Sequence, residues 1–391
     1  MTFFTRSVRN ESFRMMDVPA ASVFPCGAPQ ANGQSSSRPY ARPMPVNHSL
    51  VEAVARGESL PTGTLLALAR TSPRDLLDTA EAVTRRCASR VFNLCGIINA
   101  KSGACSENCR WCAQSRHWSV PGVRVFPIVA DDAVEAGAKR AEASGVVRYS
   151  LVTSGRKPSR RELRELCERV RSLKAAHPAL EVCVSLGLLS SSDLAALKEA
   201  GVERIHCNLE SSRRFFPEVC SSHAYDDKIR TLREARAAGL EVCSGGLIGM
   251  GETLEDRIEL ARTLRELEVP SIPINMLHPV AGTPLGDMTP LSDGEFLEAV
   301  AIFRLLNPTA LLRFAGGRLQ LSPEAVREAV RVGVNAAISG DFLTTCGATP
   351  LDDAQLFLEA GYEAEPATRA ALTVREAEKD AAAAAAAAAT S

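Results

Sequence analysis

Three cysteines stand close together in the segment CSENCRWC, at Cys105, Cys109 and Cys112. Thiolates at this spacing bind soft metals, either zinc in a structural site or the iron of an iron-sulfur cluster. Structural zinc takes four ligands, and no fourth Cys or His follows at the spacing of a zinc finger; the nearest histidine is His117. A [4Fe-4S] cluster normally takes four thiolates, so three leave one iron open to a small molecule. The triplet therefore predicts an iron-sulfur cluster with an open iron.

The composition narrows the chemistry. The chain holds 12 cysteines in 391 residues and is too long to need disulfides, so we expect reduced thiols that bind metal. Lys and Arg number 45 against 46 Asp and Glu, which gives no reason to expect nucleic acid as a partner. No stretch is apolar for long enough to cross a membrane, and the first residues lack the apolar core of a secretory signal. These observations predict a cytoplasmic protein without a membrane partner.

Short apolar runs alternate with longer amphipathic segments, and these elements must position the triplet. The runs are rich in β-branched residues, as strands are, and the segments between them have helical period, as at 159–176 and 225–239. The predicted strands cover 91–98, 146–153, 180–187, 203–210, 240–248, 270–277, 310–317 and 333–340. This alternation predicts an α/β fold, the (β/α)8 or TIM-type barrel, whose active sites lie after the carboxyl ends of the strands. The triplet follows the first strand.

Three regions of the chain differ in composition. Residues 1–47 are rich in Pro, Ser, Gly and Asn without a periodic apolar face, which predicts a disordered tail. Residues 48–365 contain the predicted barrel, with amphipathic segments before residue 91 that we expect to be helices added across its bottom or side. Residues 366–391 carry charges and then a run of alanines, so we expect a tail with no face to bury.

The triplet, with an aromatic residue at Trp111 before its last cysteine, resembles that of the radical S-adenosylmethionine superfamily. The resemblance implies that Cys105, Cys109 and Cys112 hold a [4Fe-4S] cluster, whose open iron chelates the amino and carboxylate groups of S-adenosylmethionine. It also implies that an electron from the cluster cleaves the sulfonium to give a 5′-deoxyadenosyl radical. A closed barrel suits this chemistry because it keeps a reactive radical away from water.

Longer motifs resemble the biotin synthase family, from about Leu65 to Tyr362. They are SGACSENCRWCAQS, HCNLESS, EVCSGGLIGMGET, PINMLHPVAGTPL, LRFAGGR and FLTTCGATPLDD. The resemblance implies a sulfurtransferase that inserts sulfur into dethiobiotin to form biotin, reduced by an electron donor such as flavodoxin or ferredoxin, and a possible homodimer. It also implies that the last part of the barrel is a biotin- and thiamin-synthesis-associated region. The alternatives are a radical enzyme of the hydrogenase-cofactor maturase or methylornithine synthase type, or a non-catalytic iron-sulfur protein.

The same resemblance assigns the polar residues at the strand ends. The residues implied for S-adenosylmethionine are Trp111, Asn208, Glu210, Lys228, Gly249 and Gly251. Those implied for dethiobiotin are His206, Asn208 and Asn275. The residue types suit these ligands, because a carboxylate accepts two hydroxyl hydrogen bonds from a ribose and an amide offers both the donor and the acceptor that a urea needs.

The resemblance further implies an auxiliary iron-sulfur cluster, [2Fe-2S] or a variant, held in the barrel by three Cys and one Arg. Cys183, Cys243 and Arg313 match three of these positions, but the fourth is Ser150, whose oxygen is a poor ligand for a soft cluster. Cys95, on the strand expected beside Ser150, is the thiol we expect to replace it.

Other cysteines are less suited to that role. Strand alternation turns Cys207 outward if Asn208 points inward, and Cys346 falls in a loop after the last strand. The remaining cysteines outside the triplet that fall on helices or flanking segments, and that we expect to be small core residues, are Cys87, Cys167 and Cys220.

Overall fold

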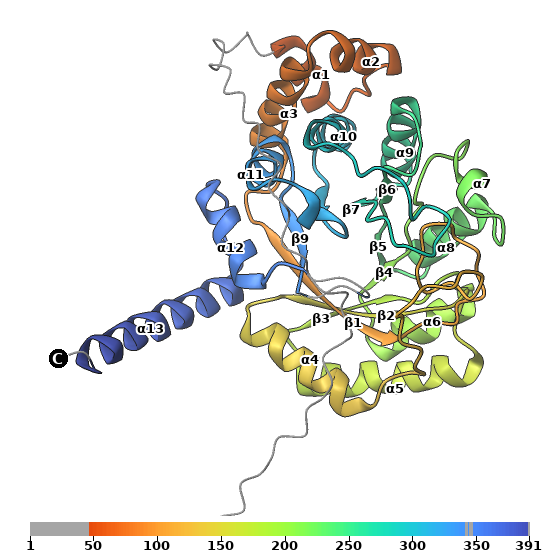
Figure 1. Cartoon of the computed structure of the whole chain (residues 1–391), viewed down its shortest axis with the longest axis vertical. Helices are drawn as coiled ribbons and strands as arrows, with labels where there is room; N and C mark the ends of the chain where they lie inside the picture. Colours follow the sequence, from red (N-terminus) through yellow and green to blue (C-terminus); the bar gives the residue numbers. More distant parts are fainter. Residues whose placement is uncertain (1–46, 341–342, 344–346, 390–391) are drawn as a thin grey trace, which may run out of the picture.

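A computed structural model describes residues 47–340, 343 and 347–389 of the chain. Within this described part, the strands form one parallel sheet that closes into a barrel, because Cys243 of β5 pairs with Ser271 of β7 (Figure 1). The strands are β1 (Asn93–Lys101), β2 (Arg148–Thr153), β3 (Glu181–Ser185), β4 (Arg204–His206), β5 (Glu241–Cys243), β6 (Gly246–Ile248), β7 (Ser271–Met276), β8 (Leu311–Phe314) and β9 (Ala336–Ser339). The predicted barrel is confirmed.

The predicted strand at 240–248 is divided into β5 and β6. The break falls at Gly245, where a Cβ atom would lie 1.9 Å from the carbonyl oxygen of Pro273, so a residue with a side chain does not fit. Gly245 donates its N–H to the side chain of Asn208 (2.9 Å) instead of extending the strand. The division therefore brings the backbone of this strand close to a predicted ligand-binding side chain.

Helices alternate with the strands and surround the barrel (Figure 1). They are α1 (His48–Ala55), α2 (Thr62–Thr71), α3 (Pro73–Cys87), α4 (Asp131–Ala143), α5 (Arg160–Ala176), α6 (Ser191–Ala200), α7 (Phe216–Val219), α8 (Tyr225–Ala237), α9 (Leu254–Glu266), α10 (Asp293–Leu306), the 3₁₀ turn η1 (Arg318–Gln320), α11 (Pro323–Val332), α12 (Pro350–Glu359) and α13 (Pro366–Ala389). Ser159 caps the start of α5 in a reciprocal capping box with Glu162. Gly239 follows α8 with a φ of +74°, a left-handed conformation that favours glycine.

The two faces of the strands differ in chemistry. The outward side chains are apolar and pack against the helices; among them are Leu94, Leu151, Val184, Ile205, Val242, Ile272, Leu312 and Phe314. The side chains that alternate with them line the lumen and are buried polar groups and thiols, including Cys95, Arg148, Ser150, Cys183, Arg204, Cys243, Ser271 and Arg313. A lumen of this kind differs from the branched apolar layers that usually fill such barrels.

The terminal segments lie outside the barrel. The helices α1–α3 precede β1, and α3 packs against α10 and α11 on the barrel's side. The predicted tail at 1–47 lies outside the described residues except for Asn47, which caps α1. Among the described residues, no helix is long and apolar enough to cross a membrane.

The C-terminal segment differs from the tail expected there. Its residues form α13, which projects away from the barrel (Figure 1). Thr368 in its first turn is buried and donates a hydrogen bond to the carbonyl of Gly145 (2.6 Å), and Ala371 is nearly buried. The expectation of no buried face is therefore wrong for the first turns, because the end of α4 offers a glycine against which the helix can pack.

Candidate active site

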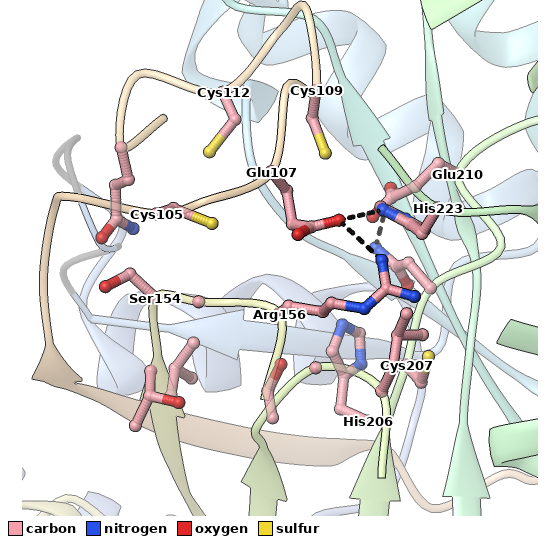
Figure 2. Close-up of a pocket in the computed structure, with 18 of the residues that line it drawn as sticks. Cys105, Glu107, Cys109, Cys112, Ser154, Arg156, His206, Cys207, Glu210 and His223 are labelled. Atoms are coloured by element: carbon pink, nitrogen blue, oxygen red, sulfur yellow. Dashed lines mark hydrogen bonds and ion pairs between the residues drawn. The ribbon is translucent and has the colours of Figure 1, made fainter. Parts of the chain in front are cut away.

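The three cysteines of the triplet lie on the loop between β1 and α4. Figure 2 shows the sulfurs of Cys105, Cys109 and Cys112 on the rim of one cavity, which has a volume of about 240 Å³. Burial raises the pKa of Cys112 to about 11, and the neighbouring thiol of Cys105 acts in the same direction. Three thiols that face one cavity from a short loop suit a cluster held by three thiolates with one iron open.

Gln114 ties the two ends of this loop together. Its side-chain oxygen accepts hydrogen bonds from the hydroxyl of Ser102 (3.2 Å) and the N–H of Gly103 (2.9 Å), and its backbone carbonyl accepts from the N–H of Cys105 (3.0 Å). Gly103 and Ala104 have φ of 71° and 49°, so the chain turns sharply just before Cys105. The sequence analysis did not single out Gln114, although it lies within the cysteine motif.

Two adjoining cavities receive most of the predicted binding residues. The first is lined by the triplet and by Trp111, His206, Asn208, Glu210 and Lys228. The second, of about 260 Å³, shares Trp111, Asn208 and Glu210 with it and adds Asn275. Residues from separate strands and loops thus meet around two cavities that share part of their lining, at the carboxyl ends of the strands.

Three polar side chains in the wall of the first cavity contact one another in series. The amide of Asn208 donates to Glu210 (3.3 Å), and the Glu210 carboxylate lies 4.0 Å from the ammonium of Lys228. Burial alone would lower the pKa of Lys228, but the surrounding groups, Cys207 and Glu210 first among them, raise it, so the ammonium stays charged. Glu210 has a φ of 71°, which is uncommon for a residue other than glycine. Such strained backbone conformations cluster at functional sites.

Asn275 faces the second cavity from β7. Its amide donates to the carbonyl of Gly246 (3.0 Å), and its oxygen accepts from the N–H of Gly316 (3.0 Å). These bonds fix which end of the amide is the donor and hold the side chain in one orientation. Gly249 and Gly251, in contrast, form the turn after β6 at φ of 94° and 104° and line neither cavity.

Below the first cavity, the lumen brings together Cys95, Cys183, Cys243 and Arg313. All four are buried, and the charge of each affects the pKa of others in the group. Burial raises the pKa of Cys183 to about 12. Burial also acts to raise the pKa of Cys243, but a hydrogen bond with His206 and the charge of Arg313 lower it to about 6. His206 thus links the cavity above to the thiols below.

Arg313 is held mainly by neutral groups. Its guanidinium donates to the hydroxyl of Ser271 (3.1 Å), the carbonyls of Asn93 and Ala337 (both 3.1 Å) and the side chain of Asn93 (2.7 Å). Within the described residues, no carboxylate pairs with it. A salt bridge therefore does not explain its burial, and at least one of its five N–H groups is left for another acceptor.

Ser150 lies beside the same group, at the position opposite Cys183 in the register of β2 and β3. Cys95 sits opposite Arg148 on the neighbouring pair, so both adjacent strands of β2 carry an inward thiol. Cys207 lies elsewhere, on the wall of the first cavity near Lys228. The expectation that strand alternation turns it away from Asn208 is wrong, because β4 ends at His206 and both residues line this cavity. Cys346 lies outside the described residues.

The guanidinium group of Arg148 is buried in the lumen and only partly hydrogen-bonded. Its Nη2 atom pairs with Glu181 and, at 3.6 Å, with Glu241. Its Nε and Nη1 atoms are buried without a hydrogen-bond partner among the described residues. Buried N–H groups without acceptors are costly, so these two atoms of Arg148 suit an anionic group bound in the lumen.

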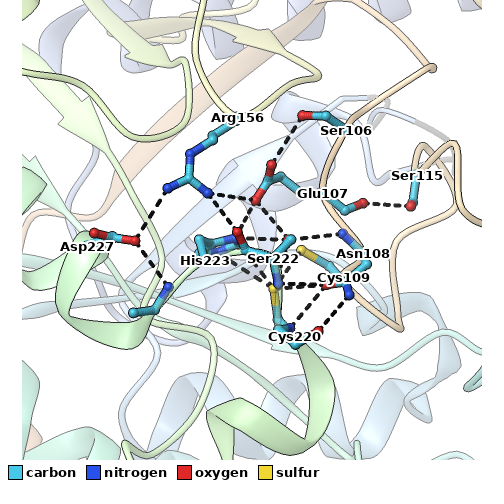
Figure 3. Close-up of polar contacts among 12 residues, drawn as sticks. Ser106, Glu107, Asn108, Cys109, Ser115, Arg156, Cys220, Ser222, His223 and Asp227 are labelled. Atoms are coloured by element: carbon cyan, nitrogen blue, oxygen red, sulfur yellow. Dashed lines mark hydrogen bonds and ion pairs between the residues drawn. The ribbon is translucent and has the colours of Figure 1, made fainter.

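A second group beside the triplet was not expected from the sequence. Figure 3 shows Cys220 and His223 next to Cys109, and Glu107 in contact with His223, Ser222 and Arg156. Cys220 is buried in the core as expected, but its sulfur also contacts Cys109 and His223, which the sequence analysis did not anticipate. The spacing of Cys220 and His223, typical of metal ligands, was a signal for this group, but their partner Cys109 lies far away in the chain.

Comparison with known proteins agrees with this geometry. Residues 100–264 match the model of the radical SAM superfamily, and residues 273–363 match the biotin and thiamin synthesis associated domain. The biotin synthase of Akkermansia muciniphila is 45% identical over 320 residues, which are 82% of this chain and 99% of that protein. The chain belongs to the biotin synthase family. The biotin synthase of Porphyromonas gingivalis is 46% identical over 299 residues, 76% of this chain and 90% of that one.

Solved structures outside the biotin synthase family share the fold at low identity. A methylornithine synthase superposes with a TM-score of 0.69 at 17% identity, over 82% of this chain and 98% of that one. A maturase of the [FeFe]-hydrogenase superposes with a TM-score of 0.69 at 15% identity, over 81% and 75% of the two chains. These two likenesses concern the barrel alone, whereas the relatives named biotin synthase match sequence across most of the chain.

Proposed function

We propose that this protein forms biotin by inserting sulfur into dethiobiotin, with S-adenosylmethionine as the source of the radical. The family supports this reaction, and the lumen is the observation that carries it. His206 lines the cavity of the triplet and is hydrogen-bonded to Cys243, so a sulfur-bearing cluster held by Cys95, Cys183, Cys243 and Arg313 would lie close to the substrate. An enzyme of the methylornithine synthase type that donates no sulfur, or a non-catalytic iron-sulfur protein, does not require such a group.

In the first cavity, Cys105, Cys109 and Cys112 would hold the [4Fe-4S] cluster. When bound, the cluster supplies the electron that cleaves S-adenosylmethionine. Glu210 offers the carboxylate for the ribose hydroxyls, and Lys228, kept charged by its surroundings, offers a cation for the methionine carboxylate. Trp111 and Asn208 complete the wall, and the backbone after β6, near Gly249 and Gly251, is a lesser candidate because it lies outside the cavity lining.

In the second cavity, Asn275 and Asn208 would hold the ureido group of dethiobiotin, with His206 at the boundary toward the lumen. Both amides are already oriented by backbone groups, so the binding geometry is preorganised. The reductant we propose is a small electron carrier of the flavodoxin or ferredoxin type, in the cytoplasm.

Cys95, Cys183 and Cys243, with Arg313, would hold the auxiliary cluster. Cys95 takes over the position left by Ser150, because it lies on the strand next to Ser150 and within the same electrostatic group as Cys183. Arg148 also has buried N–H groups without a partner among the described residues, to which a sulfide or thiolate of the cluster would be an acceptor.

Anaerobically reconstituted protein tests this proposal by separate measurement of iron, 5′-deoxyadenosine and biotin. We expect Cys95→Ala to lose iron beyond the first cluster and to stop forming biotin while it still releases 5′-deoxyadenosine. Cys167→Ala, which removes a buried cysteine on α5 away from the lumen, is the matched control and should behave like the parent. If the Cys95 variant kept its iron and formed biotin, the ligand set proposed for the lumen would be wrong.

A further inference from the structure

Cys109, Cys220 and His223 form a compact set of metal-binding side chains. Cys109 comes from the triplet loop, whereas the other two lie between α7 and α8 (Figure 3). The two sulfurs are 3.6 Å apart, and the Cys220 sulfur is 3.8 Å from Nε2 of His223. One ligand atom from each residue lies within 4.8 Å of the others.

Glu107 fixes the orientation of the imidazole. Its carboxylate lies 2.7 Å from Nδ1 of His223 and also accepts from the hydroxyl of Ser222 (2.8 Å) and from Arg156 (3.3 Å). Nδ1 is 3.4 Å from the Cys220 sulfur, but the short contact with the carboxylate makes Glu107 its main partner. A proton on Nδ1 then leaves the lone pair on Nε2, as in histidines that bind a metal while they donate to a carboxylate.

The distances suit a tetrahedral ion. Zinc binds sulfur at about 2.3 Å and histidine nitrogen at about 2.0–2.1 Å, so tetrahedral angles place two sulfurs about 3.8 Å apart and sulfur and nitrogen about 3.6 Å apart. The contacts of Cys220 are 3.6 Å to the sulfur of Cys109 and 3.8 Å to Nε2 of His223. The sulfur–sulfur and sulfur–Nε2 separations therefore suit one ion, once the imidazole turns so that the Nε2 lone pair, rather than the ring edge beside Nδ1 (3.4 Å), faces the Cys220 sulfur.

We propose that Cys109, Cys220 and His223 bind one divalent cation of the zinc type in protein that lacks its [4Fe-4S] cluster. A water molecule completes the four ligands, and the thiols release their protons as the cation binds. Because Cys109 is also a proposed cluster ligand, the cation and the cluster compete for it. This competition rests on the proposed function, whereas cation binding does not.

Cobalt(II) is the probe for the site, because its absorption reports thiolate ligation. Full-length protein, freed of iron by anaerobic chelation and reduced, should bind one Co²⁺, and Zn²⁺ should displace it. Cys220→Ala and His223→Ala should each weaken binding at least tenfold, and His223→Cys should restore it. Glu107→Gln should weaken it about 10- to 100-fold, as for other partners of metal-binding histidines.

Two variants serve as controls for this titration. Cys105→Ala keeps the proposed ligands and Cys167→Ala removes a distant thiol, so both should leave the Co²⁺ affinity within about twofold. Equal weakening by Cys105→Ala and Cys220→Ala, with no effect of His223→Ala, would place the ion on the triplet and overturn the proposal. Absence of a thiolate-cobalt band in the parent protein would overturn it as well.

Reconstitution with iron and sulfide tests the competition. Prior loading with Zn²⁺ should slow the appearance of cluster absorbance at least tenfold in the parent protein and should have no effect on Cys220→Ala. Cluster formation at the same rate in the loaded parent, with zinc retained, would overturn the competition. A failure of the proposed function is distinguishable, because a cluster that persists in Cys105→Ala contradicts the triplet assignment but leaves the cobalt titration unchanged.

Discussion

The triplet loop and the barrel lumen each bring together three thiols. The loop thiols are close in sequence, whereas the lumen thiols are far apart in sequence. Cys105, Cys109 and Cys112 lie within one loop, so their spacing alone indicates a shared ligand. Cys95, Cys183 and Cys243 lie on β1, β3 and β5 and meet only because the sheet closes. A motif can therefore reveal the first site, whereas the second becomes visible only once the barrel is known.

The two regions also differ in charge. The loop thiols lie beside a carboxylate and an imidazole, in Glu107 and His223, which can form part of a cation site. The lumen thiols lie among three buried guanidinium groups, those of Arg148, Arg204 and Arg313, whose charges act to lower the thiol pKa values, although burial still raises that of Cys183 to about 12. On the proposed assignments, the loop would favour exchange of metal and the lumen would favour retention of a sulfide-rich cluster.

The largest effect is expected from the loop. Replacing Cys105, Cys109 or Cys112 by Ala removes one of only three anchors, so release of 5′-deoxyadenosine should fall below detection. Biotin formation should fall with it, while the thiols of the lumen remain in place. Chromatography of anaerobic reactions measures both products. If any of the three variants released 5′-deoxyadenosine at the parental rate, the loop would not be the site of S-adenosylmethionine cleavage, and the contrast with the lumen would fail.

In the lumen, a lost thiol should be replaceable from the adjacent strand. Ser150 faces Cys183 in register and lies on the strand next to that of Cys95, so Ser150→Cys supplies a third lumen thiol in place of the one that Cys95→Ala removes. The double variant should regain the auxiliary iron and biotin formation that Cys95→Ala loses. Ser150→Ala in the same background is the control and should restore neither. If the double variant also lacks auxiliary iron, then a third thiol in the lumen is not sufficient, and the position of Cys95 itself is required.

Arg313→Met separates a role at the cluster from a role in the fold. The change removes the donor to the carbonyls of Asn93 and Ala337 and to the hydroxyl of Ser271, which keeps only its contact with Cys243, so stability should fall by about 3 kcal/mol. Auxiliary iron should be lost as well. Arg304→Met is the matched control, because Arg304 is fully buried and bonded to carbonyl groups outside the lumen. It should lower the thermal midpoint by a similar amount but leave iron content per folded protein unchanged.

Sequence patterning was sufficient to predict the barrel, because each strand's outward face is apolar and each helix has its own periodic face. The division of one strand at Gly245 could not be predicted, since it depends on how closely Pro273 approaches from β7. The buried turn at Thr368 was missed for the same reason, because the contact with Gly145 joins distant parts of the chain.

The candidate site was predictable to the extent that its residues share a motif. The strand-end positions of Asn208, Glu210 and Asn275 bring them to adjoining cavities. Cys220 and His223 were not found as neighbours of the triplet, because nothing in the sequence pairs them with a loop more than a hundred positions away. Gln114 was missed although it lies within the motif, because its role depends on the fold of the loop. The roles of the individual ligands stay predictions until the variants are measured.

The smallest effect is expected at Gln114, which supports the triplet without contributing a thiol. Gln114→Ala removes the acceptor for the hydroxyl of Ser102 and the N–H of Gly103, both buried, and should cost about 1–2 kcal/mol. The loop should then hold the first cluster less fully, with occupancy after reconstitution lowered a few-fold, while the lumen keeps its iron. Gln114→Glu retains an acceptor and should recover most of the occupancy, and Gln355→Ala on exposed α12 is the control for loss of an amide. Thermal unfolding and iron content check these outcomes. Equal loss of iron from both regions in Gln114→Ala would mean that the loop and the lumen are not independent.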